Sequence, residues 1–343
     1  WNDTARQLRQ CSFRKISATC AKRLSYRDNS GVCGPGWQLL AQAQLLDQRG
    51  VAAAILALEV IQQRAALVHH ADQTAARVMD VDVIPAQVNA EGRLTGEAVA
   101  AAIAGEDVDR IFAVVATAGT TNFGIVDEIA SIAKVAKQHD KWLHVDGAYG
   151  LAAILDESKR GLFAGVDHAD SVIVDPHKWL FAPFDACALI YRDPEIARAA
   201  HTQHGEYLEP LESGEWNPSD YAINLTRRPR GLPLWFSLAT HGVAAYREAV
   251  ETNCQLARAA AELIRQRDDL ELVREPMLSV VVFKKHGWQQ SDYDAWSDKL
   301  LADQVAFVVP SSHHGEPNLR FAIVNPTTTI ETIKEILDRI EKD

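Results

Sequence analysis

Apolar runs alternate with segments of helical periodicity along the middle of the chain. Three short apolar runs, at 111–117, 142–146 and 171–174, are typical of buried strands. Two stretches with apolar residues at helical spacing, 98–104 and 126–139, each precede one of these runs. Helix–strand alternation at this spacing predicts right-handed crossovers and a mainly parallel sheet, which is an α/β fold.

The pattern changes after residue 194. A polar loop is followed by a long helical stretch, at 233–266. The remaining chain predicts a strand, a helix, two strands and a final helix, at 279–285, 291–304, 307–310, 318–324 and 329–342. Three threonines after Pro326 offer hydroxyls for the N-cap of the last helix. This order predicts a small α/β domain at the C-terminal end.

The chain is therefore divided into four parts: an atypical segment at 1–40, a large domain at 41–200, a loop region at 201–230, and the long helix with the small domain at 231–343. Residues 1–40 hold seven Lys or Arg, two Asp or Glu and three of the five cysteines, with little periodicity. We expect this first segment to lie outside the fold formed by the rest.

Composition excludes several classes of function. The chain has 343 residues, 47% hydrophobic and 24% charged, which is enough for a large core. A net charge of −11 argues against nucleic-acid binding, and the longest apolar run, 51–58, is too short to span a bilayer. The cysteines show no metal spacing, which favours reduced thiols in the cytoplasm. The histidine pairs at 69–70 and 313–314 are expected to be surface or loop residues, and we predict no metal site.

One lysine has a distinctive chemical setting. Lys178 follows the apolar run 171–174 and His177, and it has Trp179 and Phe181 beside it. Because aromatic neighbours solvate an ammonium group poorly, we expect a free amine that can attack a carbonyl. Such a lysine can hold pyridoxal 5′-phosphate (PLP) as a Schiff base, whereas a lone Lys–Trp pair is more often an ordinary surface feature.

A second strand end supplies an acid. Asp146 lies thirty-two residues before Lys178, and PLP needs an anion at its pyridine nitrogen because a protonated ring accepts electrons more readily. The ends of parallel strands converge on one crevice, so both side chains can reach one ligand. The small residues Gly147 and Ala148 leave room for a flat ring beside the backbone.

These segments together resemble the group II PLP-dependent decarboxylases, which include aromatic-L-amino-acid, glutamate, histidine and diaminobutyrate decarboxylases. The resemblance runs from about residue 65 to the C-terminus and rests on motifs at 117–121, 144–149, 175–179, 225–228, 234–235 and 319–326. It implies fold type I of the PLP-dependent transferases, which is aspartate aminotransferase-like, and a homodimer.

The resemblance also implies roles for individual residues. Lys178 would form the Schiff base with PLP, and Asp146 would pair with the pyridine nitrogen. His177 would lie at the phosphate or the Schiff base, and Thr121 and Ala148 would line the ring.

The implied reaction converts an L-amino acid to its amine and CO2. Tyr207, in the polar stretch 204–220, matches the tyrosine of the family's flexible catalytic loop and would protonate Cα directly or through a water. We favour an aromatic amino acid, with diaminobutyrate or glutamate close behind.

Two departures from the family pattern keep other functions under consideration. No Gly/Ser/Thr phosphate loop is recognisable before a helix near the beginning, which we interpret as truncated or altered. The ring-stacking histidine expected after Thr74 is missing, although His69 and His70 lie just upstream. The alternatives are a non-catalytic remnant that acts as an interaction subunit, and an aminotransferase or lyase of the same fold. A nucleotide-binding Rossmann protein is disfavoured, since no Gly-x-Gly-x-x-Gly follows an early strand.

Overall fold

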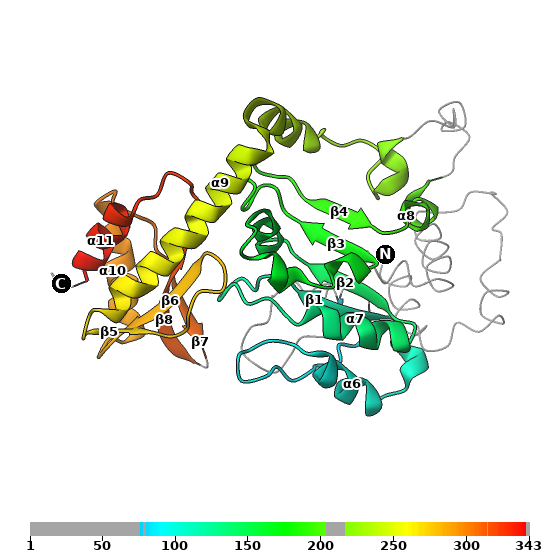
Figure 1. Ribbon diagram of the computed structural model, residues 1–343, viewed down its shortest axis with the longest axis horizontal. Helices are drawn as coiled ribbons and strands as arrows, with labels where there is room; N and C mark the ends of the chain where they lie inside the picture. Colours follow the sequence, from blue (N-terminus) through cyan, green and yellow to red (C-terminus); the bar gives the residue numbers. More distant parts are fainter. Residues whose placement is uncertain (1–75, 78–79, 204–216, 314, 341–343) are drawn as a thin grey trace, which may run out of the picture.

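The computed structural model describes residues 76–340 apart from 78–79, 204–216 and 314. The predictions for residues 1–75 and for Tyr207 therefore lie outside the described residues. Within the described part of the chain, two four-stranded sheets are connected by the long helix α9 (Gly231–Arg265), which runs from the first sheet to the C-terminal unit (Figure 1).

The first sheet has the strand order β1-β2-β3-β4. It consists of β1 (Ala113–Thr117), β2 (Trp142–Asp146), β3 (Ser171–Val174) and β4 (Ala188–Tyr191). The first three strands are parallel, and β4 runs antiparallel to β3. The prediction of three strands in a mainly parallel α/β sheet is confirmed. β1 is buried throughout, whereas residues 172–174 of β3 are only partly buried.

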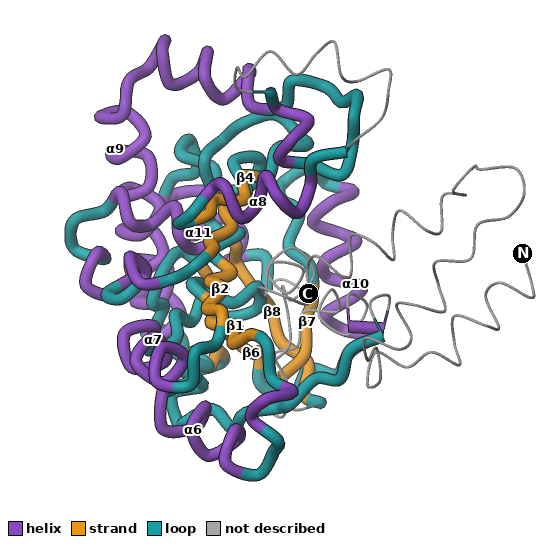
Figure 2. Tube along the Cα trace, turned by 90° about the vertical axis from the view of Figure 1, so that its right-hand side faces the viewer, coloured by secondary structure: helices purple, strands orange, loops and turns teal. Residues whose placement is uncertain are grey.

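Two helices cover one face of this sheet. α6 (Gly96–Ala104) begins after Thr95, whose hydroxyl caps the helix by accepting a hydrogen bond from the Ala98 N–H at 3.2 Å. α7 (Ile129–Gln138) is strongly amphipathic and packs its buried face onto β1 and β2. Figure 2 shows α6 and α7 together on one side of the strands.

The C-terminal unit is built on an antiparallel sheet with the order β5-β6-β8-β7. Its elements are β5 (Leu270–Leu272), β6 (Val280–Lys285), α10 (Gln290–Ala302), β7 (Pro310–His313), β8 (Glu316–Ala322) and α11 (Ile330–Asp338). Buried residues of β6 and β8, such as Phe283 and Phe321, pack with small residues of α9, including Ala257 and Ala260. Small residues on the helix allow close approach to the sheet, so α9 belongs to this core as well.

Shorter elements complete the described chain. They are α8 (Pro194–His201) and the 3-10 turns η2 (Val108–Arg110), η3 (Gly150–Leu155), η4 (Arg160–Phe163), η5 (Val166–His168) and η7 (Pro218–Tyr221). Of the strands and α-helices, β4, β5 and α8 were not predicted. The strand expected at 307–310 is wrong, because Phe307 is 71% exposed and pairing starts only at Pro310.

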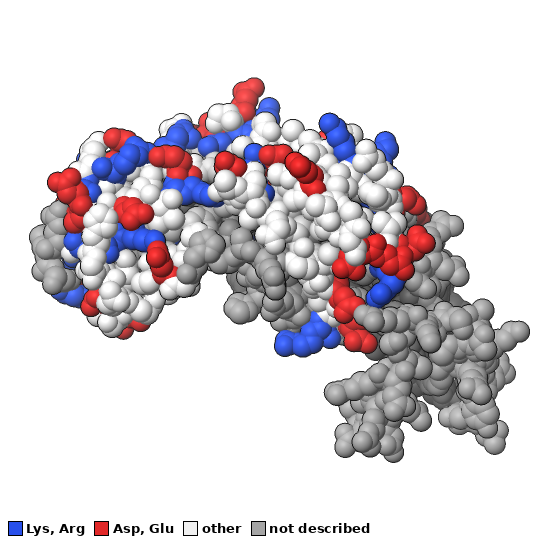
Figure 3. Space-filling view, turned by 90° about the horizontal axis from the view of Figure 1, so that it is seen from below, with Lys and Arg blue, Asp and Glu red and all other residues white. Residues whose placement is uncertain are grey.

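Charged side chains are dispersed over part of the surface. On the face shown in Figure 3, acidic and basic side chains are intermixed over the C-terminal unit and form no large patch of one sign there. Within the described residues, none of the helices combines the length and the apolar composition that a membrane span requires.

Candidate functional site

The loops that follow β2 and β3 lie side by side. The Gly147 N–H donates to the Ile173 carbonyl and the Asp175 N–H donates to the Ala148 carbonyl, each at 3.0 Å. These bonds continue the parallel pairing of the two strands beyond their last residues. The carboxyl ends of β2 and β3 therefore form one continuous rim, as predicted for the candidate site.

Asp146 presents one carboxylate oxygen at this rim. Its Oδ1 accepts a hydrogen bond from the Ala148 N–H at 3.0 Å, and the residue is half-buried between Thr117 of β1 and Ile173 of β3. No group in the described part of the chain donates to its Oδ2. A carboxylate fixed through one oxygen can bind a ligand proton with the other.

Lys178 is paired with a carboxylate. Its Nζ lies 2.9 Å from Oδ2 of Asp175, and its side chain is 36% exposed. The side chain of Trp179 points away into the core and is completely buried. The predicted dry, aromatic setting of Lys178 is therefore wrong: the amine has an ionic partner and access to solvent.

Asp175 is a site residue that the sequence reasoning missed. Its side chain is only 11% exposed, and Oδ1 is buried without a hydrogen bond of ordinary geometry from the described residues. Among the described residues, His177 lies with Nε2 3.9 Å from Oδ2, and the thiol of Cys187 is a weak donor to Asp175. A buried carboxylate oxygen without a strong donor is costly, which makes Asp175 a candidate site residue. The position of Asp175, directly after an apolar strand, could have identified it as a candidate site residue from the sequence.

His177 is held by the backbone next to Lys178. Its Nδ1 lies 3.0 Å from the N–H and 2.5 Å from the carbonyl of Ala186, and the Phe184 ring contacts it edge-on. The structure thus brings Asp146, Ala148, His177 and Lys178 together on adjacent loops.

The loop around Lys178 has an unusual backbone. Phe181 adopts φ 56°, a left-handed conformation that is rare for a bulky residue, and the Ala182 N–H closes the loop on the Pro176 carbonyl at 3.0 Å. Such backbone strain is found where the surrounding packing determines the conformation, often at functional sites.

Thr121 lies on a third loop, after β1. The residue is exposed, and its carbonyl accepts a hydrogen bond at 2.9 Å from Arg320 of β8, which also donates to Oδ1 of Asn122 at 3.1 Å. This loop meets the loop after β2 where Gly119 packs directly on Gly150. Arg320, a cation from the C-terminal unit, is a further residue at the site that the motif reading did not single out as functional.

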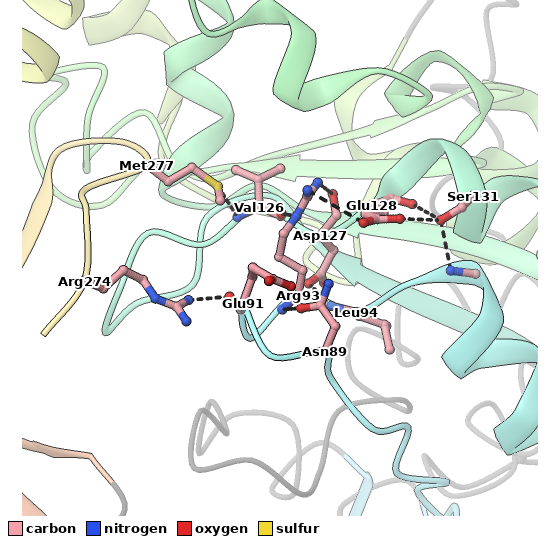
Figure 4. Close-up of polar contacts among 11 residues, drawn as sticks. Asn89, Glu91, Arg93, Leu94, Val126, Asp127, Glu128, Ser131, Arg274 and Met277 are labelled. Atoms are coloured by element: carbon pink, nitrogen blue, oxygen red, sulfur yellow. Dashed lines mark hydrogen bonds and ion pairs between the residues drawn. The ribbon is translucent and has the colours of Figure 1, made fainter.

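A buried carboxylate fixes the end of β1. Asp127 accepts hydrogen bonds from the Thr117 N–H at 2.7 Å and the Leu94 N–H at 2.8 Å, and it is 1% exposed. Figure 4 shows Asp127 within a polar cluster in which Arg93 donates to the Val126 carbonyl at 2.7 Å. The cluster determines where β1 ends and thus where the Thr121 loop begins.

A buried histidine lies two residues before Asp146 on the same face of β2. Ser171 accepts a hydrogen bond from the Trp142 indole at 2.9 Å and lies 2.7 Å from Nδ1 of His144. Burial lowers the pKa of His144 to about 4, so its ring is neutral. Its Nε2 has no partner among the described residues.

The described residues contain no group of three or more His, Cys, Asp or Glu side chains placed to hold a metal ion. The rim brings together an amine, two carboxylates and a neighbouring histidine.

Comparison with protein families gives a match over residues 48–286 to the pyridoxal-dependent decarboxylase conserved domain. The chain is 32% identical over 240 residues to an aromatic-L-amino-acid decarboxylase of Bacillus atrophaeus, covering 67% of this chain and 50% of that protein. It is 27% identical over 274 residues to an L-2,4-diaminobutyrate decarboxylase of Acinetobacter baumannii, covering 76% of this chain and 50% of that protein. The chain spans about half the length of these curated relatives.

A crystal structure of Oryza sativa TDC with PLP and tryptamine is similar to the fold described above. Its TM-score is 0.75 at 26% identity, over 88% of this chain and 67% of that chain. The family that the motifs resemble and the predicted fold type are thereby confirmed. The chain belongs to the pyridoxal-dependent decarboxylase family.

Proposed function

We propose that this protein binds PLP and catalyses the decarboxylation of an L-amino acid to the amine and CO2. One observation carries the proposal: a lysine amine and a carboxylate with one available oxygen lie on two hydrogen-bonded loops at the ends of adjacent parallel strands. PLP, when bound, supplies an aldehyde that reacts with amines and a pyridine ring that accepts the electrons of the broken bond.

The residues at the rim suit this cofactor. Lys178 would hold it covalently after leaving Asp175, which now lies 2.9 Å from the amine. Asp146 would hold the proton of the pyridine nitrogen with its Oδ2, while the Ala148 N–H keeps the other oxygen in place. The small side chain of Ala148 would border the ring, and His177 would lie beside Lys178.

Thr121 would line the ring, and Arg320 beside it suits the substrate side of the site. Arg320 is half-buried and receives no carboxylate partner from the described residues, and burial lowers its pKa from the ordinary value. A half-buried cation whose hydrogen-bond partners are an amide and a carbonyl can accept an anion. We propose that Arg320 orients the carboxylate of the amino acid next to Thr121. Tyr207 would return a proton to Cα, a role that stays a prediction from the sequence motif.

The substrate, assembly and location are proposed from weaker signals. An aromatic amino acid is favoured because the chain is 32% identical to an aromatic-L-amino-acid decarboxylase, with diaminobutyrate second. A homodimer is supported by an exposed apolar face on the first turns of α9, where Trp235 is 60% and Phe236 56% exposed. The cytoplasm is supported by the scattered cysteines.

Adding PLP to the purified protein tests the proposal. We expect a new visible absorbance band that persists on dialysis, and borohydride reduction should fix the label on Lys178 in the peptide map. Carbon dioxide release should then be found with aromatic L-amino acids in a panel that includes diaminobutyrate and glutamate. A label on another lysine would overturn the assignment of the site.

The alternatives give different results in the same assays. A non-catalytic remnant would show no band or a band without CO2 release. An aminotransferase would convert PLP to its amine form with an amino acid and release no CO2. The variant Asp146→Asn separates cofactor binding from catalysis, because it keeps the acceptor for Ala148 and removes the charge. It should retain the band and lose on the order of a hundredfold in turnover.

A further inference from the structure

Two aromatic rings join the loops that carry Asp146 and Lys178. Tyr149 lies three residues after Asp146, and Trp179 directly follows Lys178. Their rings are stacked with centroids 5.1 Å apart and an angle of 14° between the planes. The relative position of the two loops is therefore set by this stack as well as by their backbone hydrogen bonds.

The polar end of Tyr149 is bound to the C-terminal unit. Its hydroxyl lies 2.5 Å from the Ser279 hydroxyl and accepts a hydrogen bond from the Ser279 N–H at 3.2 Å. Ser279 is completely buried just before β6. Burial raises the pKa of Tyr149 above its ordinary value, so the hydroxyl keeps its proton in these contacts.

The polar end of Trp179 is bound to the same unit through α9. Its indole N–H donates to Oδ1 of Asn253 at 2.9 Å, and the side-chain amide of Asn253 donates to the Asn325 carbonyl at 3.0 Å. Trp179 and Asn253 are both completely buried. Each ring of the stack thus has one face on the other ring and its polar edge on the C-terminal unit.

The segment that delivers Ser279 is itself fixed to the large domain. The carbonyl of Met277 accepts a hydrogen bond from Lys159 at 2.8 Å, and its sulfur lies 3.2 Å from the Val126 N–H. Arg274 donates to the Glu91 carbonyl, as Figure 4 shows together with the Met277 contact. The segment before β6 is therefore anchored where Ser279 contacts Tyr149. Through this contact, the position of the segment can affect the position of the Tyr149 ring.

We infer that Tyr149 is a positioning residue: through its stack on Trp179 and its hydroxyl on Ser279, it sets the place of the Lys178 amine relative to Asp146. The docking of the C-terminal unit thereby becomes part of the geometry of the site. The consequence for decarboxylation rests on the proposed function, whereas the positioning of Lys178 does not.

The variant Tyr149→Phe tests this inference, because it keeps the stacked ring and removes only the hydroxyl. Tyr293→Phe is the matched control: Tyr293 is buried in the C-terminal unit, and its hydroxyl accepts a hydrogen bond from the Lys285 N–H at 3.0 Å. Both variants lose one buried tyrosine hydroxyl, but only the first lies at the site. Both should lower the melting temperature by similar amounts.

The reactivity of each lysine is measured without PLP, by trace acylation with acetic anhydride and peptide mapping over a range of pH. In Tyr149→Phe we expect the rate for Lys178 to change roughly threefold or more, which corresponds to the loss of about one hydrogen bond. Lys284 and Lys299 should keep their wild-type rates. In Tyr293→Phe the pH profile of Lys178 should match the wild type.

Ser279→Ala is a second variant for the case that Tyr149→Phe does not fold. It removes one of the two contacts and should change the Lys178 profile in the same direction by a smaller factor. An unchanged Lys178 profile in the folded variant overturns the inference, as does an equal change at all lysines.

Addition of PLP to the wild type gives the separate test of the proposed function. If no band forms while the Lys178 profile responds to Tyr149→Phe, the positioning stands and the proposed function fails. If the band forms and the Lys178 profile does not respond to Tyr149→Phe, the cofactor binding required by the proposed function is supported and the positioning role of Tyr149 is overturned.

Discussion

The amine of Lys178 must leave Asp175 before it can attack an aldehyde. The two groups lie 2.9 Å apart, and Asp175 is the more buried partner. Asp175 therefore competes with an aldehyde for the amine of Lys178, and it holds this side chain at the end of β3. If Lys178 captures PLP as proposed, the strength of this ion pair should affect the rate of capture.

Asp175→Asn should consequently speed the covalent capture of PLP. An amide binds an ammonium group more weakly than a carboxylate does. Partly exposed ion pairs contribute about 0.2–1 kcal/mol, so we expect the reaction to be about 1.4 to 5 times faster. Stopped-flow absorbance after mixing with PLP measures it. Asp269→Asn, which removes the ion pair of Lys285 in the C-terminal unit, is the control and should leave the rate unchanged. A slower reaction of Asp175→Asn would mean that the carboxylate assists capture.

His144 makes the stability of the fold depend on pH. Its pKa is lowered to about 4 by burial, from the ordinary 6.5. Between these values the unfolded chain binds a proton that the folded chain does not bind. The free energy of unfolding is therefore fully preserved above pH 6.5 and falls as the pH drops towards 4.

His144→Gln removes this titration. At about 1.4 kcal/mol per pH unit, the wild type should lose about 2 kcal/mol more of its free energy of unfolding than the variant between pH 7 and pH 5. Urea denaturation at the two pH values measures the difference. The variant of an exposed histidine, His168→Gln, should keep the wild-type dependence. Equal pH dependence of wild type and His144→Gln would show that the ring is charged in the fold.

At the scale of elements, the parallel strands could be predicted from sequence and the short antiparallel edges could not. Residues 171–174 form a strand with the predicted bounds, because three consecutive β-branched residues favour an extended backbone. β7 has the polar sequence Pro-Ser-Ser-His, while Phe307 and Val309 before it are exposed. β7 forms because it pairs with β8. The hydrophobic pattern within β7 itself does not predict this pairing.

The contact between two glycines fixes how the loops after β1 and β2 meet. A Cβ on Gly150 would lie 2.3 Å from the Ala118 carbonyl oxygen and 2.7 Å from Cα of Gly119, while Gly119 itself has φ 112°. Backbone atoms cannot move aside as a flexible side chain can. The two loops therefore need glycine at this contact.

Gly150→Ala should destabilise the protein by about 1–3 kcal/mol, the usual cost of forcing an extra methyl group into a packed region. It should also weaken PLP binding, because the Asp146 and Thr121 loops are forced apart. Gly161→Ala in η4 is the control, since a Cβ there meets no atom within 4 Å. Urea denaturation and PLP titration of both variants give the comparison. Equal stability of the two would contradict the close approach.

For the molecule as a whole, the placement of Asp146 and Lys178 on one rim could be predicted from sequence, because they follow neighbouring parallel strands. The direction of Trp179 could not be found in this way. Its indole is buried because Asn253, far along the chain on α9, accepts the indole N–H. The ion pair of Lys178 and the role of Ser279 likewise depend on tertiary packing. Tyr207 lies outside the described residues, so its role stays a prediction.

The first turns of α9 carry a set of exposed apolar side chains at helical spacing. Leu232, Trp235 and Phe236 are 47%, 60% and 56% exposed, and the two aromatic rings contact each other edge-on. Residues at i, i+3 and i+4 form one stripe of a helix, and exposed apolar stripes usually bind a partner. We propose a second copy of the chain as this partner.

Trp235→Glu should therefore break the dimer. A charge at the centre of an apolar interface costs about 2 kcal/mol or more, so the dimer affinity should fall roughly thirtyfold. Sedimentation velocity over a range of protein concentrations measures it. Leu301→Glu is the matched control, because Leu301 on α10 is also an apolar residue with 52% exposure but lies outside the stripe. The control should sediment as the wild type does. A wild type that stays monomeric at high concentration would refute the homodimer, and a dimer that survives Trp235→Glu would place its interface on another face.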